Sequence, residues 1–112
     1  MYAKLSLEEL RIQLTKNEIN YNMLNIESYD FICCEDGNIF RKMKSGNWKK
    51  IENKSNHKKG YNVILINKKQ YSRAKLIMYS YGKIEINEKN TNIYHINKDK
   101  LDCSYKNLTL NN

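Results

Sequence analysis

The sequence contains no proline, and it has little cysteine, glycine and tryptophan. Its three cysteines are Cys33 and Cys34, which are adjacent, and Cys103. An odd number of cysteines is a poor basis for a disulfide framework, which argues against a small secreted scaffold. The absence of a Cys-x-x-Cys pair argues equally against a zinc-ribbon fold. The lack of proline, beside abundant Lys, Asn and Ile, is typical of coding in an AT-rich genome.

Long hydrophobic runs and a leader pattern are also missing. No stretch approaches the roughly 20 apolar residues that cross a membrane, and no signal-peptide pattern opens the chain. We therefore expect a cytoplasmic protein without a membrane partner. The chain does have 112 residues, of which 40% are hydrophobic and 11% aromatic. That composition supports one small folded core rather than a disordered chain.

Positive charge is concentrated in the middle of the chain. The formal net charge is +8, yet residues 1–40 hold three basic and seven acidic residues. Residues 41–59 hold eight basic residues against Glu52 alone. A segment with this charge is typical either of a surface that binds phosphate groups or of a solvent-exposed loop that keeps the protein soluble. The candidate nucleic-acid-binding residues are seven of its eight cations and two aromatic residues in or just after the segment that can stack on bases: Arg41, Lys42, Lys44, Trp48, Lys49, Lys50, Lys58, Lys59 and Tyr61.

The first residues predict an amphipathic helix. Ser6 and Glu9 have the spacing of a capping box, and leucines at helical spacing follow, which indicates a helix that ends near Lys16. Leu5 before the cap can pack against Leu10 as a hydrophobic staple. The helix has an acidic flank, so we expect it to pack on the rest of the chain or on a partner protein rather than on DNA.

The middle of the chain predicts short strands and a second helix. Gly37 marks a hairpin turn, because glycine accepts positive φ. Ser72 is placed to cap the second helix and Gly82 to end it. The expected strands lie at 29–34, 38–43, 48–51, 60–66 and 70–71, and the expected second helix at 73–81.

These elements predict an α+β fold: an N-terminal helix, a small antiparallel β-sheet with a short helix, and a C-terminal hairpin. We divide the chain into an N-terminal helical segment at 1–24, a small basic sheet with its helix at 25–83, and a C-terminal segment at 84–112.

The C-terminal segment carries the most informative pattern, Tyr94-His95-Ile96-Asn97-Lys98-Asp99, followed by Asn107-Leu108. It resembles a degenerate and truncated form of the ββα-metal motif of HNH endonucleases of the phage and homing type. The resemblance implies that the C-terminal hairpin has a ββα-like fold. It implies that His95 corresponds to the general base that activates the attacking water. It also implies that Asn107 holds the loop beneath the histidine.

The preceding segment carries a second resemblance. It is carried by four short runs, in this order along the chain: Tyr29-Asp30-Phe31-Ile32, Asp36-Gly37-Asn38-Ile39-Phe40-Arg41, Lys59-Gly60-Tyr61-Asn62-Val63-Ile64-Leu65 and Arg73-Ala74-Lys75-Leu76-Ile77. Their order is similar to the segment before the HNH motif in phage and intron-associated nucleases. That segment forms a small sheet like the DNA-binding modules of homing endonucleases and AP2-type domains.

The chain departs from the HNH pattern at its metal ligands. Tyr94 stands where the family has its metal-binding Asp, and the sequence given stops before the position of the helix ligand. A phenol is a poor ligand for Mg²⁺, which prefers carboxylates. We therefore expect no metal and no cofactor, with Mg²⁺ needed only if Asp99, Asp102 or a partner chain completes the site. If His95 has no residual catalytic role, it is either an ordinary residue of the sheet or a contact to nucleic acid.

Three functions remain open. The first is a catalytically impaired phage or mobile-element protein derived from an HNH homing-type nuclease, which binds nucleic acid or a nucleoprotein through its basic face. The second is an active, metal-dependent HNH nicking endonuclease. The third is a small phage inhibitor of a host defence complex, of the anti-CRISPR type, with the N-terminal helix as a plausible protein contact. A phage-encoded protein would act in the host cytoplasm.

Overall fold

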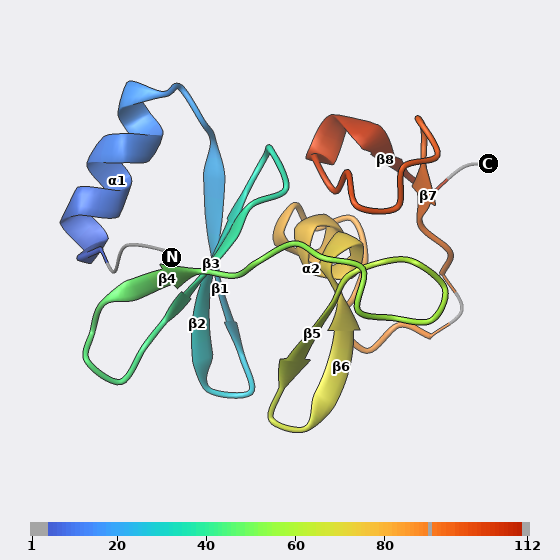
Figure 1. Ribbon diagram of the computed structural model, residues 1–112, viewed down its shortest axis with the longest axis horizontal. Coiled ribbons are helices and arrows are strands. Elements are labelled where there is room, and N and C mark those ends of the chain that lie inside the picture. Colours follow the sequence, from blue (N-terminus) through green and yellow to red (C-terminus); the bar gives the residue numbers. More distant parts are fainter. Residues whose placement is uncertain (1–4, 90, 111–112) are drawn as a thin grey trace.

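The computed structural model describes residues 5–89 and 91–110, and it has the predicted α+β architecture (Figure 1). The elements follow in the order α1 (Leu7–Lys16), β1 (Tyr21–Ile26), β2 (Tyr29–Cys34), β3 (Ile39–Lys42), β4 (Trp48–Lys50), β5 (Val63–Ile66), β6 (Lys69–Ser72), α2 (Arg73–Ser80), β7 (Tyr94–His95), the 3-10 turn η1 (Tyr105–Asn107) and β8 (Leu108–Thr109).

The first four strands form an antiparallel sheet in the order β1-β2-β3-β4. Phe31 pairs with Arg41 across β2 and β3, and Arg41 pairs with Lys49 across β3 and β4. Because neighbours along a strand point to opposite faces, Arg41 and Lys49 share a face with Phe31. Lys42 and Lys50 lie on the other face.

Helix α1 covers one face of this sheet, on the left in Figure 1. Its N-terminus has the predicted capping box, in which the Ser6 hydroxyl accepts from the Glu9 N–H and the Glu9 carboxylate accepts from the Ser6 N–H. Leu10 and Leu14 are buried against Ile32, Cys34 and Trp48. The expected packing of this helix on its own chain is thus confirmed.

The opposite face of the sheet carries the larger core, which extends to Leu108 of the C-terminal segment. Phe31, Cys33 and Ile39 from the sheet share one buried cluster with Leu76 and Ile77 of α2. Cys103 and Leu108 belong to the same cluster. Ser72 caps α2 through a bond from the Lys75 N–H, and Gly82 follows the helix with a φ of 71°, both as predicted.

The C-terminal segment docks against the turn between β2 and β3 (Figure 1). The Tyr105 N–H donates to the Glu35 carbonyl at 2.8 Å, and the Tyr105 ring stacks on that of Tyr81 with centroids 3.8 Å apart. A Cβ on Gly37 would lie 2.8 Å from the Cys103 carbonyl carbon. The turn and the C-terminal segment are therefore in direct backbone contact.

One predicted boundary differs from the observed elements. Strand β1 begins at Tyr21, inside the segment predicted to be helical, and pairs with the whole of β2. Residues of the segments 25–83 and 84–112 contribute to the same buried cluster. Within the described residues, no helix is both long enough and apolar enough to cross a membrane.

Candidate nucleic-acid interface and C-terminal loop

The predicted basic residues of β3, β4 and the turn between them line two depressions at this end of the sheet, and we call this set the β3–β4 surface: Arg41, Lys42, Lys44, Lys49 and Lys50. Arg41 is its centre, because it lines two neighbouring depressions of about 570 and about 340 Å³. The first also contains Lys42 and Lys44, and the second Lys49 and Lys50. The Arg41 guanidinium lies 4.6 Å from the centroid of the Tyr29 ring, which holds it by a cation–π contact.

Positive charge is in excess on the β3–β4 surface, because its five cations share the two depressions with two carboxylates, Asp30 and Glu52. The ion pairs found in the described part of the chain are Lys54–Glu52 and Lys69–Glu27, and neither includes a cation of this surface. The strand register nevertheless divides the cations between two faces of the sheet. A ligand must therefore approach the edge and turn of the β3–β4 hairpin to contact all five.

The prediction that Trp48 stacks on bases is wrong. Its side chain is only 2% exposed and lies in the cluster beneath α1. Strand alternation explains the error, since Trp48 points inward while its neighbour Lys49 is exposed. The Trp48 indole N–H is also a buried donor without an acceptor among the described residues.

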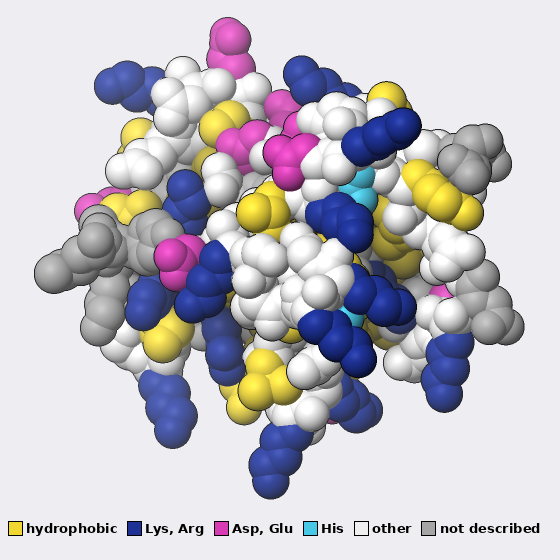
Figure 2. All heavy atoms as spheres, turned by 45° about the vertical axis from the view of Figure 1, so that its right-hand side comes forward, with side chains coloured by type: hydrophobic (Ala, Val, Ile, Leu, Met, Phe, Trp, Pro, Cys, Tyr) yellow, Lys and Arg dark blue, Asp and Glu magenta, His cyan; other side chains and the backbone are white. Residues whose placement is uncertain are grey.

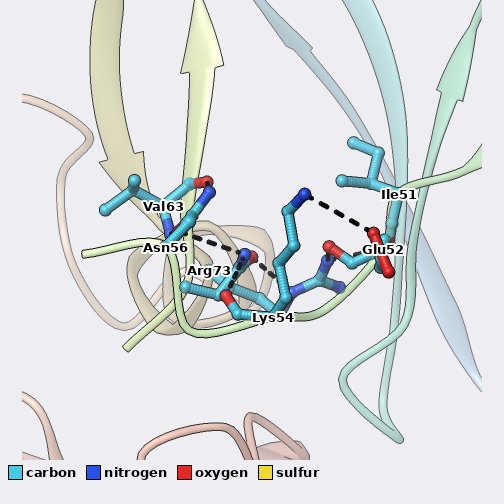
Figure 3. Close-up of polar contacts among 7 residues, drawn as sticks. Ile51, Glu52, Lys54, Asn56, Val63 and Arg73 are labelled. Atoms are coloured by element: carbon cyan, nitrogen blue, oxygen red, sulfur yellow. Dashed lines mark hydrogen bonds and ion pairs between the residues drawn. The ribbon is translucent and has the colours of Figure 1, made fainter. Parts of the chain in front are cut away.

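The other predicted contacts lie on the loop that connects β4 to β5, and Arg73 holds this loop in place (Figure 3). Arg73 is fully buried at the start of α2. Its guanidinium donates to the Ile51 carbonyl at 2.8 Å, to the Glu52 carbonyl at 3.1 Å and to the Asn62 side chain at 2.9 Å. Sequence reasoning gave Arg73 no such role, because these acceptors are distant in the chain.

Within this loop Lys58 and Lys59 are exposed, and Tyr61 is half-buried. The Tyr61 ring stacks on that of His57, with centroids 4.2 Å apart. The Lys59 carbonyl accepts a hydrogen bond of 2.7 Å from Lys100 Nζ. The loop cations therefore adjoin the C-terminal segment instead of the β3–β4 surface, and the predicted contacts fall into two groups.

In the C-terminal segment Asn107 pins the loop between β7 and β8. Its side chain is 93% buried, and its Oδ1 accepts from the Asn97 N–H at 3.0 Å. Its Nδ2 donates to Asn97 Oδ1 at 3.0 Å and to the Asp102 carbonyl at 2.8 Å. A single amide thus fixes both halves of the loop.

His95 lies at the end of β7, paired with Leu108 of β8, and is half-buried. Its Nε2 is 3.9 Å from the Cys103 sulfur. Burial lowers the pKa of His95, and the charges of Asp102 and Asp99 oppose this effect without reversing it. Burial also raises the pKa of the Cys103 thiol to about 11. Near neutral pH the pair is therefore an uncharged imidazole beside an uncharged thiol.

The residues near His95 do not fit a divalent metal. Tyr94 offers a phenol, while both Asp102 oxygens accept hydrogen bonds, Oδ1 from Ser104 and Oδ2 from Asn97. Asp99 Oδ1 likewise accepts from the Leu101 N–H. Across residues 5–89 and 91–110, no three His, Cys, Asp or Glu side chains converge as a metal site would require.

A pocket of about 360 Å³ lies between His95, Cys103, the start of α2 and the segment that follows α2. Figure 2 shows histidine atoms bordered by Lys and Arg side chains on this side of the molecule, around a recess with hydrophobic atoms. The pocket depends on the fold of the loop, so no local sequence pattern indicated it.

Comparison with known proteins gave no family assignment: no protein-family model, curated protein or solved structure matches this chain.

Proposed function

We propose that this protein binds nucleic acid through the β3–β4 surface and Lys58 and Lys59, and that it does so without cleaving its ligand. The observation that carries the proposal is the excess of positive charge on the β3–β4 surface, where five cations and two carboxylates line two neighbouring depressions and none of these cations is in an ion pair found among the described residues. Lys and Arg gain affinity for a phosphate backbone by displacing its condensed counterions, and this term needs no base contact.

The proposed loss of cleavage is supported by the state of the carboxylates near His95. Both oxygens of Asp102 already accept hydrogen bonds, from Ser104 and from Asn97, and these bonds hold the carboxylate to the loop. The retained HNH-like residues are accounted for by folding alone, since Asn107 closes the loop. The proposal thus describes a protein of HNH-nuclease ancestry that keeps a binding surface.

The test is a gel-shift titration of labelled duplex DNA and of duplex RNA in EDTA, over a range of salt concentrations. We expect the affinity to fall steeply with salt, by about 0.9 in log–log slope for each phosphate contacted. The variant Lys49→Glu, Lys50→Glu, Lys58→Glu, Lys59→Glu should lose binding. The matched control changes the exposed Lys16, Lys68, Lys83 and Lys106 to Glu and alters the net charge equally. Equal losses in both variants would show that net charge, and not this surface, accounts for the binding.

A second assay addresses cleavage. Supercoiled plasmid is incubated with the protein and Mg²⁺ or Mn²⁺, beside the His95→Ala variant. We expect no nicking by either protein. Metal-dependent nicking by the unmodified chain that disappears in His95→Ala would restore the nuclease alternative. Absence of both binding and nicking would favour the inhibitor of a host complex, and a pull-down from host lysate would follow.

A further inference from the structure

We infer that the pocket beside His95 is a binding site for a single nucleotide, either an unpaired residue of a nucleic-acid strand or a free mononucleotide. This inference rests in part on the proposed function, and it adds a ligand class to it. A volume of about 360 Å³ lies at the small end of the roughly 300–1,000 Å³ typical of ligand pockets. The pocket is therefore suited to one nucleotide and too small for a base pair.

The floor of the pocket, which is its buried lining, is mainly apolar. Ala74, Ile84 and Cys103 line it and are each at least 93% buried, and Ile93 adds a half-buried side chain. The buried Asn62 also lines it, with its amide bonded to the Lys54 carbonyl and to Arg73. Burial keeps the Cys103 thiol uncharged at neutral pH, since its pKa is raised to about 11. A flat aromatic base gains from contact with such a surface, whereas a bare phosphate does not.

The rim of the pocket is polar, with a net positive charge. Lys75, Lys89 and Lys100 line it together with one acidic residue, Glu88, and Lys75 Nζ is held in position by the Glu88 carbonyl at 2.9 Å. These cations suit the phosphate of a nucleotide whose base occupies the floor. His95 also lines the pocket, and a neutral imidazole both donates and accepts hydrogen bonds, as the edge of a base requires.

The pocket is continuous with the basic loop. Lys100 lines the rim while its Nζ bonds to the Lys59 carbonyl, and Tyr61, stacked on His57, forms part of the wall. A strand whose backbone passes Lys58 and Lys59 therefore lies close enough to insert one residue. A base inside a duplex is stacked and paired, and extracting it costs a few kcal/mol. An unpaired residue avoids that cost, so the pocket selects strands with an unpaired end.

The first experiment compares one labelled hairpin DNA with and without a short unpaired overhang, by fluorescence anisotropy in EDTA. We expect the overhang to strengthen binding by about ten-fold, the usual effect of one base stacked on a protein surface. Ala74→Leu, which fills the floor, should abolish this preference and leave the affinity for the blunt hairpin unchanged. Urea unfolding of that variant verifies that it still folds.

A variant of the rim provides an independent readout if Ala74→Leu fails to fold. Lys100→Gln should reduce the overhang preference, whereas Lys98→Gln, an equal charge change on the same loop outside the pocket, should not. The variant Lys49→Glu, Lys50→Glu, confined to the β3–β4 surface and outside the pocket, should weaken both hairpins equally. These variants therefore distinguish a wrong assignment of the pocket from a wrong proposed function.

The second experiment titrates a nucleoside monophosphate, and separately inorganic phosphate, while NMR monitors the His95 ring. A shift with the nucleotide together with an overhang preference assigns the site to a strand. A shift without that preference assigns it to a free nucleotide. An equal response to inorganic phosphate would reduce the pocket to an anion site and overturn the inference. Absence of both the preference and the shift would overturn it as well.

Discussion

Arg73 and Gly37 are joined by a hydrogen bond of 2.9 Å from the Arg73 Nη1 to the Gly37 carbonyl, although 36 positions separate them in the chain. Gly37 lies in the turn between β2 and β3, and Arg73 begins α2. The same guanidinium holds the loop that carries Lys58 and Lys59. One buried side chain therefore sets the positions of the sheet, the second helix and the basic loop relative to one another.

Replacing Arg73 by Met should destabilise the protein strongly. The change leaves the Gly37, Ile51 and Glu52 carbonyls without their donor, and breaking such a buried charged network costs about 3–5 kcal/mol. Urea unfolding followed by tryptophan fluorescence measures the loss. Arg11→Met, at an exposed position of α1, is the control. If Arg73→Met lowers the free energy of unfolding by less than about 1 kcal/mol, the hydrogen bonds of Arg73 do not hold the sheet, α2 and the basic loop together.

Gly37→Ala should cost more stability than Gly46→Ala, although both glycines have nearly the same φ, 91° and 90°. At Gly37 the added Cβ meets the backbone of Cys103 and Ser104 at 2.8 and 2.9 Å, whereas at Gly46 nothing lies within 4 Å. The positive φ costs each variant about 1–2 kcal/mol, and overpacking adds about 1–3 kcal/mol at Gly37 alone. Equal losses of unfolding free energy would show that the turn moves away from the C-terminal segment without penalty.

Leu10→Ala should destabilise the protein by about 2–5 kcal/mol, because it removes a fully buried side chain between α1 and the sheet. Ile12→Ala on the same helix is the matched control, since Ile12 is 60% exposed and should change stability by less than about 0.5 kcal/mol. Trp48, the one tryptophan of the chain, packs beside Leu10 and reports the result directly. Its emission should shift to the red as α1 detaches in urea, at a lower urea concentration in Leu10→Ala.

Stability should fall as the pH drops below about 6.5, and His95 should contribute to this fall. Its pKa is lowered from the ordinary 6.5 in the folded protein, so the unfolded chain binds a proton that the folded chain resists. Unfolding is therefore favoured as the pH falls from 6.5 toward the folded pKa. In His95→Gln the unfolding free energies at pH 7.5 and 5.5 should lie closer together. His57→Gln, which retains His95, should keep the original difference.

Local signals were enough to predict the fold class, both helices and most strands. Ser6 with Glu9 and Ser72 with Gly82 mark helix ends through bonds made within a few residues, which a sequence pattern records well. Strand β1 was missed because its turn to β2 uses Glu27 and Ser28 at positive φ, where no glycine marks the bend.

The candidate site was harder to predict, since it depends on contacts between distant residues. The run of charge between residues 41 and 59 pointed to the β3–β4 surface, but it did not reveal that Trp48 is buried or that Lys58 and Lys59 lie apart from that surface. The proximity of His95 and Cys103 and the pocket beside them arise from the closing of the loop by Asn107. Their positions follow from tertiary structure alone.

The bonds of Asn107 also bear on how this segment can vary over evolutionary time. Its amide closes the loop through Asn97 and Asp102, so natural selection for a folded protein suffices to retain it. Tyr94 takes no part in these bonds, so a substitution at position 94 leaves the closure of the loop intact. An Asn-Leu pair in such a loop can therefore be retained for folding alone, and its presence does not imply that a protein hydrolyses a phosphodiester.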